Sequence, residues 1–105
     1  MNEAKNIQNS TEQAVNYTDL LSAVNCVLSK HPEYATMAGS RGKCVDASTE
    51  LLFQLDEMYG FPVNGYVDGD DTPHHWTVVE GWCIDLTSRQ FNESDPCPKI
   101  WFNSR

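Results

Sequence analysis

Positive charge is scarce in this sequence. Seven Lys and Arg residues stand against 15 Asp and Glu, so the formal net charge is −8 over 105 residues. Nucleic-acid binding depends on clustered Lys and Arg side chains that displace counterions from phosphates, and an anionic membrane surface attracts the same clusters. The composition therefore argues against nucleic acids and membranes as partners. The length predicts one domain with a single modest core.

Long apolar runs and an export signal are also missing. Residues 51–53 are typical of the apolar runs, whereas a membrane span needs about 20 residues. Residues 1–6 are polar and no apolar stretch follows them, as a signal peptide would require. We therefore expect a cytoplasmic location, with secretion by another route left open.

Metal-site spacing is absent as well. The sequence has four cysteines, and no two of them have the C-x-x-C spacing of a zinc site; they are Cys26, Cys44, Cys83 and Cys97. Without an export signal we expect free thiols rather than disulfides. The acidic residues at 68–71 lack the order of a calcium-binding loop, so we interpret them as a solvated turn. We expect neither a metal nor a cofactor.

Hydrophobic spacing predicts the first helix after a polar tail. Residues 1–16 contain few apolar side chains and are expected to form a flexible tail, which leaves a single domain at 17–105. Thr18 or Asp19 is expected to cap a helix that runs to about Lys30.

A second helix follows a loop of small residues. Residues 37–43 include two glycines and are expected to form this loop. The next segment, 44–59, repeats apolar side chains at helical spacing, and Gly60 is the expected left-handed stop. The predicted apolar face contains Ser48, Leu51, Leu52, Leu55 and Met58.

The second half of the chain predicts a small sheet. Its segments rich in Val, Ile and aromatic residues are 61–67, 74–79, 82–86 and 100–102. Residues 68–73 have the composition of a turn, and residues 80–81 are expected to join the middle strands as a hairpin. Helices followed by a strand meander predict an α+β fold with an antiparallel sheet.

Cys44 is the candidate nucleophile because of its place at a predicted helix start. Helix N-termini present unpaired N–H groups and about half a positive charge, and Arg41 and Lys43 add positive charge nearby. Such surroundings favour the thiolate form of a cysteine. The same N–H groups can hold the oxyanion of a tetrahedral intermediate. The alternative is a buried core cysteine on the apolar face of the helix.

A cysteine nucleophile needs a base, and the base needs a group that orients it. His74 and His75 open the predicted hairpin, and neighbours on a strand face opposite sides of the sheet. A turn at 80–81 places Trp76 opposite Asp85. His74 then shares their face and lies diagonal to the carboxylate. Strand alternation therefore selects His74 as the base and Asp85 as the carboxylate that orients it.

Two alternatives to this assignment stay open. A β-bulge or an odd-length turn would reverse the alternation and select His75, or both histidines lie on the surface beside an acidic turn. Asp85 lies in a short apolar run, where a carboxylate is rarely buried without a partner. Trp76 would shield the His74–Asp85 pair from water and strengthen its interaction.

Three segments in this order resemble the transglutaminase-like branch of the papain-like cysteine hydrolases. They are Gly42-Lys43-Cys44, His74-His75-Trp76, and Ile84-Asp85-Leu86-Thr87 with Gln90-Phe91. The His-x-Trp pattern of the family falls on His74. The resemblance implies a papain-like or transglutaminase-like core, in which the nucleophile helix packs on an antiparallel sheet that supplies His and Asp.

The resemblance also implies an activity. Members of this family cut, deamidate or cross-link amide bonds of proteins and peptides through a thioester. We therefore expect a thiol protease, deamidase or transglutaminase-type enzyme with a triad of Cys44, His74 and Asp85. By analogy alone, such a compact domain suits a bacterial or phage effector or toxin. No Gln shortly precedes Cys44 to donate to an oxyanion, so helix N–H groups would serve instead.

Gln90 is expected to be a loop amide that packs on the sheet edge rather than a site residue.

An alternative function remains open for the chain as a whole. It would be a non-catalytic acidic binding or inhibitor protein that keeps the fold, and its negative surface would steer association with a basic partner.

Overall fold

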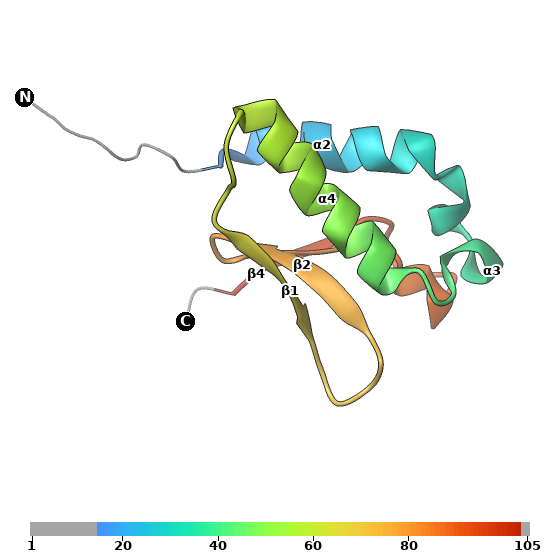
Figure 1. The fold of residues 1–105 in the computed structure, drawn as a ribbon. Coiled ribbons are helices and arrows are strands. Elements are labelled where there is room, and N and C mark those ends of the chain that lie inside the picture. The colour runs from blue at the N-terminus through green and yellow to red at the C-terminus, as the bar shows by residue number, and fades with distance from the viewer. Residues whose placement is uncertain (1–14, 104–105) are drawn as a thin grey trace, which may run out of the picture.

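A computed structural model describes residues 15–103, with helices on one side of a four-stranded antiparallel sheet (Figure 1). In chain order the elements are α2 (Tyr17–Lys30), η1 (Pro32–Ala35), α3 (Met37–Ser40), α4 (Cys44–Tyr59), β1 (Gly65–Gly69), β2 (His75–Val79), β3 (Trp82–Asp85), η2 (Ser88–Gln90) and β4 (Lys99–Phe102). The predicted α+β class is confirmed. Of the predicted tail at 1–16, residues 1–14 lie outside the described residues, whereas Val15 is buried and Asn16 caps α2.

Helix α2 starts slightly earlier than predicted. The side chain of Asn16 accepts a hydrogen bond from the N–H of Asp19 at 2.8 Å, so Asn16 is the cap and neither Thr18 nor Asp19 is. All three residue types are good caps, and the sequence alone does not decide between them. The helix ends at Lys30, as predicted, because Pro32 disfavours helical geometry in the residue before it.

Helix α4 has the predicted bounds and ends at Gly60 in the left-handed conformation, with φ 80°. Met58, predicted on its apolar face, is exposed. The predicted loop at 37–43 contains the short helix α3. Gly39 permits this helix to lie against η1, since a Cβ there would stand 2.3 Å from the carbonyl oxygen of Glu33.

The sheet has the order β1-β2-β3-β4, with antiparallel neighbours throughout. β1 begins at Gly65, later than the strand predicted at 61–67, and extends into the predicted turn at 68–73. One reason for the late start is that the N–H of Val63 donates to the side chain of Asp56 at 2.9 Å and not to a strand. The last predicted strand is confirmed as β4.

The β2–β3 hairpin has the predicted two-residue turn. Glu80 and Gly81 have φ of 52° and 90°, which is the geometry of a type I′ turn with positive φ at both central residues. Val79 pairs with Trp82, and the register continues without a bulge along the hairpin. This register decides which side chains share a face of the sheet.

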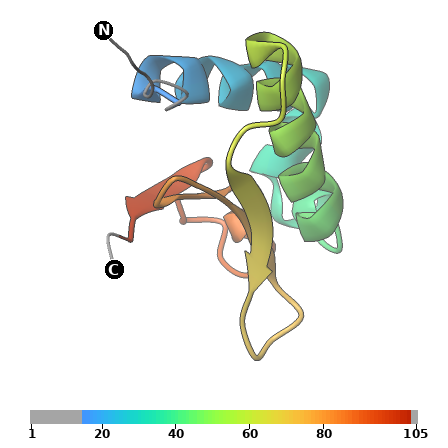
Figure 2. The same cartoon turned by 60° about the vertical axis from the view of Figure 1, so that its left-hand side comes forward.

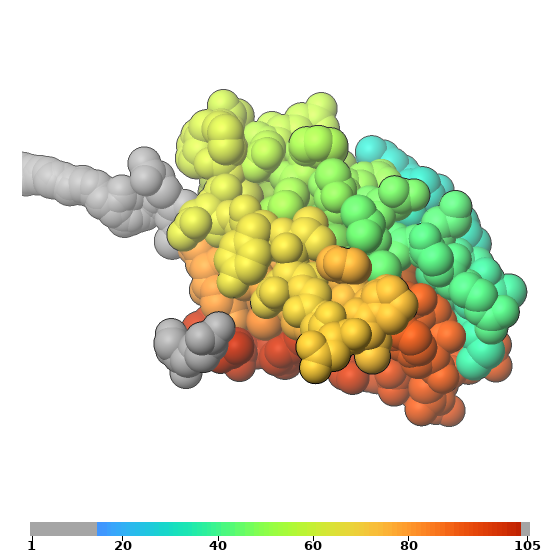
Figure 3. Space-filling model, turned by 60° about the horizontal axis from the view of Figure 1, so that its bottom comes forward, coloured from blue at the N-terminus to red at the C-terminus, as the bar shows by residue number. Residues whose placement is uncertain are grey.

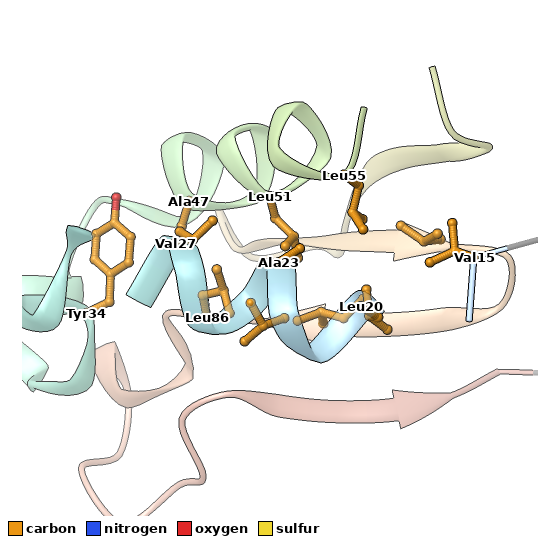
Figure 4. Close-up of a cluster of buried hydrophobic side chains, with 12 residues drawn as sticks. Val15, Leu20, Ala23, Val27, Tyr34, Ala47, Leu51, Leu55 and Leu86 are labelled. Carbon is orange, nitrogen blue, oxygen red and sulfur yellow. The ribbon is translucent and has the colours of Figure 1, made fainter. Parts of the chain in front are cut away.

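The helices cover one face of the sheet, which we call the inner face (Figure 2). α4 lies across β1 and β2 and packs beside α2. Buried side chains from both helices meet inner-face side chains of β2 and β3 (Figure 4); the main contributors are Leu20, Val24, Val27, Leu51, Leu55, Val79 and Ile84. None of the helices in the described part of the chain has the length and apolar character of a membrane span.

The central place of Leu51 in this core predicts a large effect of its truncation. Leu51 is fully buried, so Leu51→Ala removes buried methyl groups and leaves a cavity, and we expect a loss of about 2–5 kcal/mol in the free energy of unfolding. Phe53, on the same helix, is 66% exposed, and Phe53→Ala should change stability by about 0.5 kcal/mol or less. Denaturant unfolding measures both, and equal losses would contradict this core assignment.

Candidate active site

Cys44 is the first residue of α4, where the helix lacks a side-chain cap. Lys43 occupies the N-cap position, and its side chain makes no capping hydrogen bond to the helix. Gly42 has φ 74° and allows the chain to turn into the helix. The first turn of a helix has N–H groups without partners inside the helix. This end of α4 therefore offers hydrogen-bond donors and the positive end of the helix dipole beside Cys44.

The thiol of Cys44 lies against the start of β2. Its Sγ is 3.7 Å from Nδ1 of His75 and 3.7 Å from the carbonyl oxygen of Pro73. Cys44 is buried, and His75 is partly exposed. The thiol therefore lies beside an imidazole nitrogen on a ring that is partly open to solvent.

A hydrogen bond between α4 and β2 explains why Cys44 and His75 meet. The hydroxyl of Thr77 donates to the carbonyl oxygen of Ser48 at 3.0 Å, and both residues are buried. Cys44 precedes Ser48 by four helical residues, about 6 Å along α4. His75 precedes Thr77 by two strand residues, about 6.6 Å along β2. Because the two steps have nearly the same length and α4 and β2 run in a similar direction (Figure 1), this contact brings Cys44 over His75.

Gly69 leaves room for the ring of His75. The two residues are direct partners in the β1–β2 ladder. A Cβ on Gly69 would stand 2.9 Å from Cδ2 and 3.1 Å from Nε2 of the His75 ring, closer than a methyl group and a ring carbon normally approach. The missing side chain of Gly69 thus allows the ring to lie over β1 while its Nδ1 points to Cys44.

His74 belongs to a second cluster on the outer face of the sheet. Its Nε2 lies 2.5 Å from Oδ2 of Asp85, and its Nδ1 lies 3.2 Å from the amide nitrogen of Gln90. The other carboxylate oxygen of Asp85 accepts the N–H of Thr87 at 2.9 Å. His74 and Asp85 are both buried. The predicted contact between His74 and Asp85 is confirmed, and Gln90 is a member of the cluster rather than only a loop amide.

This cluster fixes the proton positions of His74 in the arrangement present. The amide nitrogen of Gln90 donates to Nδ1, so Nε2 holds the proton and donates to Asp85. Phe91 meets the His74 ring edge to face at 4.9 Å, and Trp76 lies at 6.0 Å between ring centroids. Both nitrogens of His74 are therefore engaged, and aromatic rings limit access of water.

The structure thus divides the predicted triad between two faces. Cys44 contacts His75, and Asp85 contacts His74. The sequence predicted that Cys44 would lie beside His74, but its contact is with His75. The reason is that α4 covers the inner face of the sheet, to which His75 and Thr77 belong. Strand alternation correctly paired His74 with Asp85. The alternation does not indicate which face of the sheet α4 covers.

Two of the other cysteines, Cys83 and Cys97, lie in surroundings that raise the pKa of the thiol. All four are free thiols. Burial raises the pKa of the Cys83 thiol, and Asp68 adds to that rise. Burial also raises the pKa of Cys97, which Arg89 partly opposes. The raised pKa of Cys83 and Cys97 reduces their thiolate fraction at neutral pH.

The acidic turn before β2 orders the backbone beside the thiol. The hydroxyl and the N–H of Thr72 donate to Asp70, and the hydroxyl is the main cause of the lowered pKa of that carboxyl. The N–H of His74 donates to the carbonyl of Thr72 at 2.7 Å. These bonds hold the turn in which the carbonyl of Pro73 faces Cys44.

Within residues 15–103 no group of three His, Cys, Asp or Glu side chains is arranged to hold a metal ion.

Comparison of the chain with protein-family models, with curated proteins and with solved structures gives no match. The geometry of the site is therefore the basis for assigning a function.

The packing of Gly69 on His75 yields a test of the site geometry. Gly69→Ala should displace the His75 ring from Cys44, because the added Cβ would overlap the ring. We expect the rate at which iodoacetamide alkylates Cys44 to fall by about threefold or more, although the substitution removes no functional group. Peptide mass spectrometry after timed quenching measures the rate.

A double-mutant cycle provides the control. In a His75→Ala background the ring is gone, so adding Gly69→Ala should leave the rate nearly unchanged. If Gly69→Ala had the same effect with and without the ring, the proposed contact would not be its cause.

Proposed function

We propose that the protein is a cysteine-dependent hydrolase or acyl transferase that acts on amide bonds, with Cys44 as nucleophile and His75 as general base. The contact between Sγ of Cys44 and Nδ1 of His75, at the uncapped start of α4, supports this proposal most directly. A nucleophile within reach of a base is the arrangement that covalent catalysis requires.

The contacts suggest a sequence of proton transfers. Nδ1 of His75 takes the thiol proton as Sγ attacks the amide carbonyl carbon, and N–H groups at the start of α4 stabilise the resulting oxyanion. When the C–N bond breaks, His75 returns the proton to the leaving amine and a thioester remains on Cys44. A water molecule then gives a proton to His75 and attacks the thioester, and the thiol leaves with that proton.

The His74–Asp85 pair acts in this proposal as a positioning unit. It anchors the residue before β2 through the buried contacts with Asp85 and Gln90. The resemblance to transglutaminase-like enzymes instead assigns the base to His74. Movement of Gln90 away from Nδ1 would be needed for that role. The two assignments predict opposite orders of effect for substitutions of His74 and His75.

A protein or peptide amide is the proposed substrate class. We favour water as the acceptor, which makes the protein a protease or deamidase with a papain-like or transglutaminase-like core. Transamidation to an amine uses the same thioester. By analogy with compact enzymes of this type, the proposal extends to an effector or toxin that modifies another protein.

A second candidate is a non-catalytic acidic binding or inhibitor protein. The net charge of −8 favours association with a basic partner, and the engagement of both His74 nitrogens suits a structural role. In that case Cys44→Ala would keep full activity in any assay of the binding function.

Alkylation kinetics test the catalytic proposal. At neutral pH, Cys44 should react with iodoacetamide faster than the other three cysteines. His75→Ala should slow Cys44 by about tenfold or more, because it removes the imidazole that accepts the thiol proton as Sγ attacks. The rates of Cys83 and Cys97 should rise only at higher pH than for an ordinary thiol, since burial raises the pKa of both.

His74→Ala is the matched control for His75→Ala, since it removes the neighbouring imidazole. It should slow Cys44 much less at a temperature where both variants remain folded. A larger effect of His74→Ala would transfer the role of base to His74. Equal reactivity of all four thiols in the folded protein would rule out the catalytic proposal.

A further inference from the structure

A second feature of the molecule lies on the outer face of the sheet, which the helices do not cover. Strand register brings the side chains of β1, β2, β3 and β4 together there in rows, such as Tyr66–Val78–Cys83–Trp101 and Asp68–Trp76. They surround an open hollow of about 380 Å³, which we call the outer groove. Its lining residues are Asn64, Tyr66, Asp68, Trp76, Val78, Glu80, Gly81, Cys83, Trp101 and Asn103.

Aromatic rings form much of the outer groove. The rings of Trp76 and Trp101 are 5.9 Å apart and inclined at 53°. Trp101 is 37% exposed and Tyr66 is 54% exposed, so both present ring surface to solvent. The faces of such rings attract ammonium and guanidinium groups placed within about 6 Å of the ring centre.

The charges of the outer groove have one sign. Asp68 and Glu80 line it, and the lining residues include no Lys or Arg. Oε1 of Glu80 accepts the N–H of the buried residue Val15 at 3.0 Å, so this carboxylate is already engaged by the chain before α2, and Asp68 is the carboxylate that a ligand would meet. Lys99, on β4, does not line the groove, and its Nζ faces Asp95 at 4.0 Å. Carboxylates beside exposed aromatic faces are complementary to a cation.

We propose that the outer groove binds an arginine or lysine side chain of a peptide segment in a partner protein. The cation lies over the rings of Trp76 and Trp101, with its charge directed to Asp68. The volume of the hollow is at the lower end for small-ligand sites, which suits one basic side chain and its flanking backbone. Figure 3, in which the bottom of Figure 1 comes forward, shows β1 uncovered at the front of the molecule.

The outer groove is separate from the candidate active site. Neither Cys44 nor His75 lines the outer groove. Binding of a basic segment would persist in a Cys44→Ala variant, so failure of the catalytic proposal and failure of this proposal are separate results.

The test uses two tripeptides, acetyl-Gly-Arg-Gly-amide and the same peptide with citrulline in place of arginine. Citrulline keeps the length and planarity of the side chain and removes its charge. In titrations of the full chain followed by NMR, the indole N–H signals of Trp76 and Trp101 should shift with the arginine peptide. Trp82 packs against Tyr17 and Phe102, so its signal is an internal control and should stay. The citrulline peptide should bind at least about fivefold more weakly.

Two substitutions with the same charge change provide matched variants. Asp68→Asn should weaken the arginine peptide by about threefold, as expected for loss of an exposed ion pair. Asp71→Asn changes an exposed residue of the turn that does not line the groove, and it should leave affinity within error. Tyr66→Ala should also weaken binding, whereas Phe53→Ala, which removes an exposed ring from α4, should not.

Equal binding of the arginine and citrulline peptides would overturn the proposal. So would equal effects of Asp68→Asn and Asp71→Asn, which would reduce the attraction to the general negative charge of the molecule. Shifts centred on Trp82 instead of Trp76 and Trp101 would also overturn it, because they would place the peptide elsewhere.

Discussion

The alternation of β2 under a helix layer is the constraint on which the rest of the site depends. Successive side chains of a strand face opposite sides, so His74 and His75 are separated although they are neighbours in the chain. The inner face receives α4 and with it Cys44, which meets His75. On the outer face, His74 forms a hydrogen bond with Asp85. Neighbouring residues at the start of β2 thus supply a partner to the thiol on one face and a buried hydrogen-bonded cluster on the other.

Local sequence features keep this arrangement in register. The type I′ turn at residues 80–81 joins β2 and β3 without a bulge, and a shift of one residue would exchange the two histidines between faces. The bond from Thr77 to Ser48 aligns α4 with β2. Gly69 gives the His75 ring its place over β1. None of these features includes the thiol of Cys44, yet each affects whether Cys44 and His75 meet.

Much of the fold could be predicted because its determinants are local. The turn residues at 80–81 determine the hairpin register, and helical periodicity with Gly60 determines the extent of α4. The choice of face for α4 depends on packing between segments about 30 residues apart, as in the bond from Thr77 to Ser48, and no local pattern encodes it. The roles of Gly69 and Gln90 depend on the same tertiary packing. For this reason the contact between His74 and Asp85 could be predicted from the sequence, whereas Cys44 was expected beside His74 and lies beside His75.

Formation of a thioester on Cys44 is the central claim of the proposed function, and the reaction with p-nitrophenyl acetate tests it most directly. The account predicts a rapid burst of p-nitrophenol equal to the protein concentration, because acylation of a nucleophile precedes a slower hydrolysis. Mass spectrometry of the quenched protein should find one acetyl group, on Cys44, and Cys44→Ala should show no burst. Release of p-nitrophenol without acetylated Cys44, or an equal burst from Cys44→Ala, would contradict the account.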